Sequence, residues 1–307
     1  MKRSLLTLLL AVILACGREK PSQIVTSAPA PPPPDPEKEA MQWRESRLAR
    51  LKAEDGWLSL VGLTWLSEGA NSVTLPVEPP VKVRMQLQNG KVTLQPDPGG
   101  SLTSARAPVA EPIALRDDND PKGPTIVERG SLRFHIIKRG DRYGVRMKDP
   151  NSSARTQFTG LDYFPFNPKW RVVARFIPFE EPRRVPIANV TGMTTEELSP
   201  GTLTFSVDGA EYSVQPILET GEKDFFIIFK DETSGKETYP AARYVYAPPP
   251  GPDGTTVIDF NRAYNPPCVF TPFATCPLPP PQNRLRARVE AGEKNYHSSD
   301  TAKRTAA

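Results

Sequence analysis

The sequence predicts a mainly β protein, an antiparallel β-sandwich or an open barrel, with one N-terminal helix. Three observations support this prediction. Apolar and polar residues alternate along many short segments, which is the period of a half-buried strand. Turn-forming pairs such as Asn89-Gly90 and Asp208-Gly209 separate these segments at hairpin spacing. Helical spacing of apolar residues is evident in one segment, between Glu37 and Glu54. At least ten short strands with little helix favour a sandwich or barrel.

The expected helix covers Glu37 to Glu54 and ends at Asp55-Gly56. The segment that follows, from Gly56 to Leu66, is too apolar for a surface loop and too rich in glycine for a helix. We therefore predict a buried entry strand with a turn there. The helical spacing rests on Met41, Arg44, Leu48 and Leu51, which have charged residues between them.

Three β-hairpins are predicted from the alternation. The first joins 81–87 to 92–94 across Asn89-Gly90, a pair that suits a type I′ turn. The second hairpin joins 132–136 to 143–147, and the third joins 203–207 to 212–214.

Further strands are expected at 171–177, 225–229, 243–246, 256–260 and 285–290. The run from Phe225 to Phe229 does not alternate, which predicts a central strand covered on both faces.

The N-terminus predicts export and a lipid anchor. Lys2 and Arg3 precede an apolar run that ends at Leu14, and small Ala15 stands before Cys16. This pattern matches a bacterial lipoprotein signal, with Cys16 as the acylated, palmitate-carrying first residue of the mature protein. Ten apolar residues are too few to span a bilayer, which needs roughly 20. Glycine rather than aspartate follows Cys16, which favours the outer membrane, facing the periplasm.

These features divide the chain into four parts. They are a signal peptide (1–15), an Ala/Pro-rich tether (16–36), a single β-rich domain (37–297) and a disordered tail (298–307). Proline-rich chain favours extended polyproline II, so the tether could hold the domain up to about 60 Å from its lipid. Removing Lys2 and Arg3 with the signal lowers the formal net charge from +4 to +2. Because the mature chain is nearly neutral, we expect no nucleic-acid partner.

Standard catalytic motifs are missing from the sequence. The two histidines are His135, which we expect to face solvent on a strand, and His297 in the polar tail. There is no H-E-x-x-H pattern, no G-x-S-x-G elbow and no phosphate loop. The acidic run from Asp117 to Asp120 is expected to form a solvated turn, because Pro121 follows where a calcium loop needs further ligands. We therefore expect no metal and no cofactor.

Cys268 and Cys276 enclose seven residues in a proline-rich segment. Outside the cytoplasm we expect this pair to form a disulfide, which would stabilise the fold by roughly 2 to 3 kcal/mol on the loop-entropy model. Two cysteines without a nearby histidine make an incomplete metal site, and a redox pair normally has C-x-x-C spacing.

The densest group of polar residues surrounds this proline-rich loop. If strands 256–260 and 285–290 are neighbours, the loop between them would gather acceptors, donors and positive charge at one end of the sheet. We would then expect a polar pocket there. Its candidate residues are Asp259, Asn261, Arg262, Tyr264, Asn265, Asn283, Arg284, Glu293 and Lys294.

Three interpretations of this group stay open. A binding module for a small polar or anionic ligand would use Arg262 and Arg284 as forked donors. An uncharacterised periplasmic hydrolase would use Asp259 or Glu293 as general base, without histidine. In a structural cluster, Asp259 would instead pair with an arginine and the asparagines would cap turns.

The same C-terminal stretch resembles a known family. Asp259-Phe260-Asn261 through Asn265-Pro266-Pro267-Cys268, Cys276-Pro277-Leu278-Pro279-Pro280, Asn283-Arg284-Leu285 and Gly292-Glu293-Lys294 are similar to the domain-of-unknown-function 1684 family. So is Gly56 to Leu66 with Glu68-Gly69, and the likeness runs from about Arg47 to Lys294. The family is defined by sequence, so the resemblance implies no activity, substrate or catalytic residue. We expect a lipid-anchored envelope protein that is a binding or structural module.

Overall fold

The computed structural model describes residues 35–96, 99, 101–219 and 221–296. The predicted signal peptide, Cys16, nearly all of the tether and the predicted tail lie outside the described residues. None of the helices within the described ranges is long and apolar enough to cross a membrane.

Helix α1 spans Pro36–Lys52 and confirms the predicted helix. Asp35 caps it, because its Oδ1 accepts a hydrogen bond from the backbone nitrogen of Glu37 at 3.0 Å. Arg47 and Leu51 are buried on the side of α1 that faces the protein. A second helix, α2, is a single turn at Ser153–Thr156.

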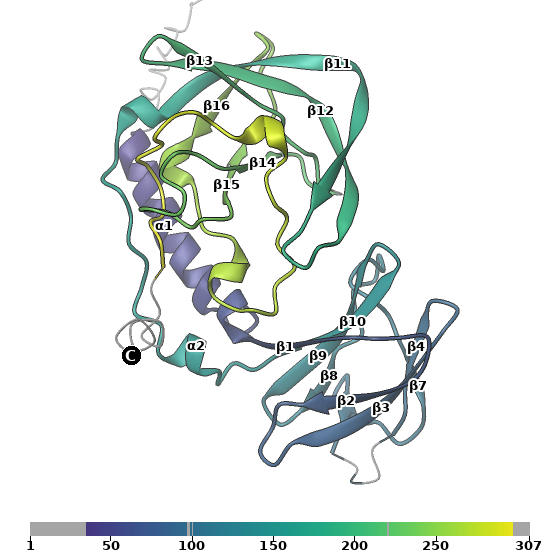
Figure 1. The fold of residues 1–307 in the computed structure, drawn as a ribbon. Coiled ribbons are helices and arrows are strands. Elements are labelled where there is room, and N and C mark those ends of the chain that lie inside the picture. Colours follow the sequence, from purple (N-terminus) through teal and green to yellow (C-terminus); the bar gives the residue numbers. More distant parts are fainter. Residues whose placement is uncertain (1–34, 97–98, 100, 220, 297–307) are drawn as a thin grey trace, which may run out of the picture. The chain divides into compact units, whose positions relative to one another are not determined.

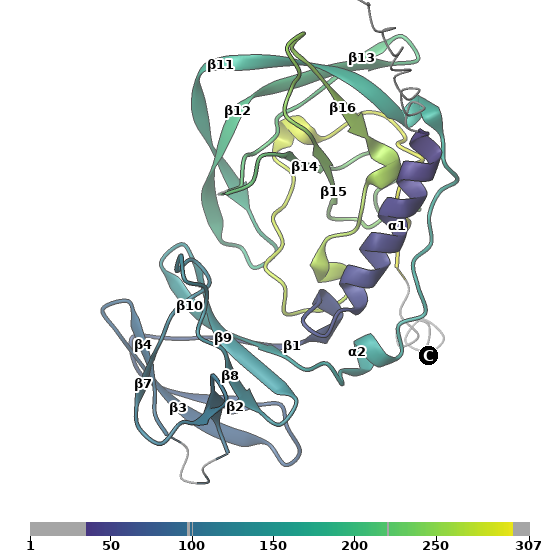
Figure 2. The same ribbon diagram turned by 180° about the vertical axis from the view of Figure 1, so that it is seen from behind.

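Residues 60–148 form two antiparallel sheets (Figures 1 and 2). One has the strand order β1-β10-β9-β8-β5-β6 and the other the order β2-β3-β4-β7. The strands are β1 Leu60–Trp65, β2 Gly69–Leu75, β3 Val81–Gln88, β4 Lys91–Leu94, β5 Thr103–Ser104, β6 Ala107–Pro108, β7 Ile113–Leu115, β8 Val127–Arg129, β9 Leu132–Arg139 and β10 Arg142–Lys148.

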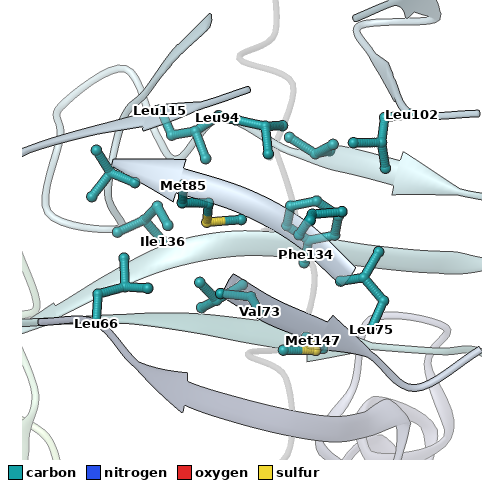
Figure 3. Close-up of a cluster of buried hydrophobic side chains, with 14 of the residues drawn as sticks. Leu66, Val73, Leu75, Met85, Leu94, Leu102, Leu115, Phe134, Ile136 and Met147 are labelled. Atoms are coloured by element: carbon teal, nitrogen blue, oxygen red, sulfur yellow. The ribbon is translucent and has the colours of Figure 1, made fainter. Parts of the chain in front are cut away.

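The apolar faces of these two sheets pack against each other. Figure 3 shows Met85, Leu94, Phe134 and Ile136 directed toward one another from strands of both sheets, and each side chain is at most 1% exposed. The predicted hairpins β3–β4 and β9–β10 are confirmed. At the β3–β4 turn Asn89 and its glycine neighbour both have positive φ, as a type I′ turn requires.

The second half of the chain forms a four-stranded sheet, β13-β12-β11-β16, and a two-stranded sheet, β14-β15. Both views show β14 and β15 inside the curve of β11 and β12 (Figures 1 and 2). Strand β14 is buried along its whole length, as its lack of alternation predicts. The hairpin β12–β13 is also confirmed. The strands are β11 Arg171–Ala188, β12 Thr194–Val207, β13 Ala210–Val214, β14 Phe225–Phe229, β15 Arg243–Ala247 and β16 Thr255–Asp259.

The fold is therefore mainly β, with antiparallel sheets and one long N-terminal helix, as predicted. Strand β11 extends well beyond the predicted 171–177, and β12 begins before the predicted 203. Their pairing shifts register between Pro178 and Arg183.

The predicted strand 285–290 is wrong. Among the residues that the structure describes, this segment pairs with no strand; its backbone bonds to the chain at 230–232 and to two buried side chains. Val289 donates from its backbone nitrogen to Asp231 Oδ2 at 2.8 Å, and Arg243 Nη2 donates to the Val289 carbonyl at 2.8 Å. Because Asp231 and Arg243 satisfy these groups, no ladder is needed. The arrangement of strands from which we predicted a polar pocket is therefore not formed.

Candidate functional site

A cavity of about 1040 Å³ lies among residues from several distant parts of the chain. Helix α1 and the turn after it, strands β9–β12, the two-stranded sheet and the proline-rich loop all contribute to its wall. Its lining side chains include Arg47, Trp57, Asp118, Arg139, Arg146, Glu197, Glu219, Glu222, Phe226, Tyr244, Tyr246, Tyr264 and Cys276.

One side of the cavity is an aromatic wall. Tyr244 and Tyr246 are two residues apart on β15, so their side chains project from the same face of the strand. Phe226 of β14 stacks on Tyr246, with ring centroids 4.9 Å apart and planes 22° apart. Tyr264, at the start of the proline-rich loop, meets Tyr244 edge to face at 5.6 Å. These rings provide the apolar surface that small-molecule sites use.

Arg146 is a buried cation in the cavity wall. It stands on β10, between β1 and β9, and the residue is 6% exposed. Its guanidinium carbon lies 5.4 Å from the ring centroid of Trp57. Among the described residues, its Nε and Nη2 have no hydrogen-bond partner. These two nitrogens form the guanidinium edge that makes forked contacts with carboxylates and phosphates.

The charge of Arg146 is not neutralised by a neighbouring carboxylate. Asp118 is the acid that acts on it, but Asp118 already pairs with Arg139 at 2.8 Å. Burial, followed by repulsion from Arg139, lowers the pKa of Arg146 to about 10. Arg146 is therefore still protonated at neutral pH and carries an uncompensated positive charge into the cavity.

A second arginine of the cavity, Arg47, is fully engaged. Its Nε donates to Glu293 Oε1 at 3.0 Å and its Nη2 donates to the carbonyl of Asn265 at 2.9 Å. Its guanidinium carbon also lies 4.7 Å from the ring centroid of Tyr264. Arg47 therefore positions the aromatic wall, while its charge is balanced inside the protein.

Glutamates line another part of the cavity. The hydroxyl of Tyr246 donates to Glu219 Oε2 at 2.6 Å. Burial raises the pKa of Glu219, the bond from Tyr246 opposes this, and the charges of Glu222 and Glu197 raise it further. The cavity thus contains groups of both signs.

Cys268 and Cys276 are free cysteines in the structure, so the predicted disulfide is not formed in it. The two are nevertheless neighbours, because the backbone nitrogen of Cys268 donates to Cys276 Sγ at 3.0 Å. The nearby Cys276 thiol, together with the Tyr239 hydroxyl, lowers the pKa of Cys268 against the effect of burial. Cys276 itself is buried and lines the cavity.

Of the nine residues predicted to form a polar pocket, Tyr264 is the one that lines this cavity. Three asparagines hold the surrounding loops. Asn261 bonds to both backbone groups of Asn167, at 2.9 and 3.0 Å. Asn265 donates to the carbonyl of Lys294, and Asn283 bridges backbone groups of 215 and 228. All three asparagines are at most 1% exposed.

The charged members of the predicted pocket do not meet in one open site. Asp259 accepts from Asn261 and pairs with Arg262 at 3.3 Å, and Arg262 also pairs with Glu39 of α1 at 2.7 Å. Glu293 is enclosed with Arg47. Arg284 is exposed, and Lys294 lies over the ring of Phe164. Asp259, Arg262 and Glu293 are therefore bonded internally, and the cavity lies elsewhere.

Sequence reasoning missed Arg146, and the pattern around it explains why. Tyr143, Val145 and Met147 mark the apolar face of β10, which assigns Arg146 to the opposite face. That face is expected to be solvated in a two-layer sandwich. Here Trp57 covers it, so the arginine is buried. His135, opposite Arg146 on β9, is likewise half-buried and does not face solvent as predicted.

Within the described ranges, no three or more His, Cys, Asp or Glu side chains are grouped so that they could hold a metal ion. The Asp117–Asp120 run forms local turns, in which Asp117 Oδ1 accepts from the backbone nitrogen of Asn119 at 2.9 Å.

Comparison with known proteins finds similarity in the C-terminal half of the chain. Residues 156–294 match the family described as protein of unknown function (DUF1684), which supports the resemblance over this range. A solution NMR structure of an uncharacterized protein from Haloarcula marismortui is 33% identical. The match covers 46% of this chain and 78% of that one, with a TM-score of 0.39. No curated protein matches the chain.

Proposed function

We propose that this chain, whose residues 156–294 match the DUF1684 family, is a lipid-anchored binding protein of the cell envelope. Its ligand would be a small anionic molecule with an apolar body, held in the cavity at Arg146. The observation that carries the proposal is the burial of Arg146 without a compensating carboxylate or a partner for Nε and Nη2.

The free-energy cost of burying the charge of Arg146 supports the presence of an anionic ligand. An isolated buried charge costs several kcal/mol, because the protein interior replaces its hydration poorly. Trp57 contributes a cation–π contact, which returns only about 0.5 to 2 kcal/mol. An anion bound against the guanidinium of Arg146 would offset the remainder through charge-assisted hydrogen bonds.

The aromatic wall supports an apolar body on the same ligand. Phe226, Tyr244, Tyr246 and Tyr264 are held by one another and by Arg47, so the surface is formed before a ligand arrives. A cavity of about 1040 Å³ is large enough for a drug-sized or metabolite-sized molecule. The hydrolase alternative has weaker support, because Asp259 and Glu293 are both bonded internally and neither lines the cavity.

A pair of fluorescent probes tests the anion site. Anilinonaphthalene sulfonate and phenylnaphthylamine share one aromatic body, and only the first carries an anionic group. We expect the sulfonate to bind with one saturable site and Arg146→Gln to weaken it at least tenfold, while phenylnaphthylamine changes less than twofold. Arg142→Gln, an exposed residue of the same strand outside the cavity wall, is the matched control. Equal sulfonate binding by wild type and Arg146→Gln, with both folded, would overturn the proposal.

The lipid anchor is tested separately on the full-length chain. We expect incorporation of a clickable palmitate analogue and recovery of the protein in the membrane fraction, both lost in Cys16→Ser. A wild-type protein that takes up no label and stays in the soluble fraction would contradict the anchor, and this result would leave the binding proposal unaffected.

A further inference from the structure

The cavity contains a second set of charges that the anion site does not use. Glu197 comes from β12, while Glu219 and Glu222 come from the segment before β14. In the part of the chain that the structure describes, none of these three glutamates forms an ion pair. Their contacts are neutral: Glu197 Oε1 accepts from the Thr195 hydroxyl at 2.9 Å, and Glu219 Oε2 accepts from Tyr246.

Aromatic ring surface lies beside these carboxylates. The hydroxyl of Tyr246 bonds to Glu219, and the residue is 40% exposed, so part of its surface is accessible. Phe226 stacks on one part of this ring, and Tyr264 lies nearly parallel to it with planes 11° apart. Carboxylates next to aromatic rings are the surroundings that ammonium groups favour, because both the charge and the ring quadrupole attract a cation.

The acidic and basic groups of the cavity do not neutralise each other directly. Arg146 comes from β10, whereas Glu197 comes from β12 and Glu219 and Glu222 come from the segment before β14. The two sets of charges therefore reach the cavity wall from different elements of the fold.

We infer that the ligand is a zwitterion, with an anionic group at Arg146 and an amine or quaternary ammonium group at Glu219 and Tyr246. This inference rests on the proposed function of the cavity. Glu197, Glu219 and Glu222 alone would not indicate a zwitterion. The buried Arg146, whose Nε and Nη2 have no hydrogen-bond partner within the described ranges, supplies the second charge in the same cavity. A ligand with both charges would satisfy both parts of the wall, and its carbon skeleton would lie along the aromatic side chains.

Competition with anilinonaphthalene sulfonate tests the inference. The competitors are terminal-amino carboxylates from four to twelve carbons long, each compared with the carboxylate of equal length that lacks the amine. We expect the amine to increase affinity at least fivefold at one favoured length and less at shorter and longer ones. Such an optimum indicates that both ends bind at once, because a chain that is too short cannot reach both groups and a longer flexible chain has a lower effective concentration at the second group.

Variants assign the two ends of the competitor. Glu219→Gln is expected to remove the advantage of the amine and to leave the amine-free carboxylates within twofold of wild type. Glu222→Gln, which changes an exposed residue, is expected to reduce the advantage in part. Glu196→Gln is the control, because Glu196 is exposed on β12 next to Glu197 and is not part of the cavity wall.

The failures of the two proposals are distinguishable. If amine-bearing and amine-free carboxylates compete equally at every length while sulfonate binding still requires Arg146, the zwitterion inference is wrong and the anion site stands. If Arg146→Gln leaves sulfonate binding unchanged, the anion site itself is wrong and the inference falls with it. An amine advantage that persists in Glu219→Gln and Glu222→Gln would also overturn the inference.

Discussion

Arg47 of α1 and Glu293, which are 246 residues apart in the sequence, form a buried ion pair with Nε and Oε1 at 3.0 Å. Their side chains are 8% and 0% exposed. The other oxygen of Glu293 accepts from the backbone nitrogen of Asn265 at 2.7 Å. The pair therefore joins the N-terminal helix to the segment that matches the DUF1684 family, and it holds Arg47 beneath Tyr264 in the cavity wall.

Glu293→Gln is expected to destabilise the protein by about 3 to 5 kcal/mol, because it leaves a buried arginine without its counter-charge. Urea unfolding followed by circular dichroism measures this change. Glu290→Gln, three residues earlier and exposed, is the matched control and is expected to cost less than about 1 kcal/mol. A loss for Glu293→Gln as small as that of the control would show that the ion pair is not buried as described.

Arg146→Met is expected to raise the free energy of unfolding by about 1 kcal/mol or more, because it removes an uncompensated buried charge and keeps most of the side-chain volume. Part of the gain is offset by the lost contact with Trp57. The same variant should lose binding of anilinonaphthalene sulfonate. A residue whose removal stabilises the fold and abolishes binding is one kept for function. Destabilisation by more than about 1 kcal/mol would instead indicate a structural role.

The stability of the protein is expected to fall between about pH 6.5 and pH 4 through His135. Burial, followed by repulsion from Arg146 opposite it and from Lys148, lowers the pKa of His135 to about 4. In the unfolded chain the pKa is about 6.5, so in this window the unfolded state binds a proton that the folded state does not. Unfolding is therefore favoured as the pH falls. Because His135 is partly exposed, we expect a contribution of about 1 to 2 kcal/mol.

His135→Gln checks this assignment. Urea unfolding at intervals from pH 7 to pH 4 should show a shallower decline of stability for the variant than for wild type. The carboxylates that titrate below pH 5 are the same in both proteins, so the difference between the two curves isolates the histidine. Parallel curves across the whole range would exclude His135 as the source.

The disulfide between Cys268 and Cys276 stays a prediction for the exported protein. The contact between the backbone nitrogen of Cys268 and Cys276 Sγ shows that the Cys276 thiol lies against the backbone of Cys268. We expect mature protein isolated under non-reducing conditions to resist alkylation at both residues, and reduction to lower its stability by roughly 2 to 3 kcal/mol. Alkylation of both thiols without prior reduction would contradict the disulfide. Comparing the stability of Cys276→Ser with that of the reduced wild type then measures how much the free Cys276 thiol contributes to the stability of the fold.

Local patterns in the sequence account for much of the fold. The hairpin at Asn89-Gly90 and the buried strand Phe225–Phe229 were predictable because each depends on neighbours a few residues apart. The segment 285–290 was not, since Asp231 and Arg243 satisfy its backbone from more than 40 positions away. Apolar alternation in that segment reflects burial, and burial does not require a strand.

The candidate site was predictable only in part. The residues around Asp259 and Glu293 carry the family resemblance, and their polar groups form ion pairs and hydrogen bonds with α1 and with nearby loops. They are therefore not available to line the cavity. Tyr264 is the predicted residue that reaches the cavity. No pattern near Arg146 indicates that Trp57 covers it.

The sequence by itself determined the class of fold, the N-terminal helix and the turns, because short-range periodicity and backbone preferences encode these features directly. Only the tertiary structure decided which charges are paired. Arg47 and Arg146 are the same residue type, and one is neutralised by Glu293 while the other lies unpaired over Trp57. The physical reason is that the energy of a charge depends on what surrounds it in space, and those neighbours come from distant parts of the chain.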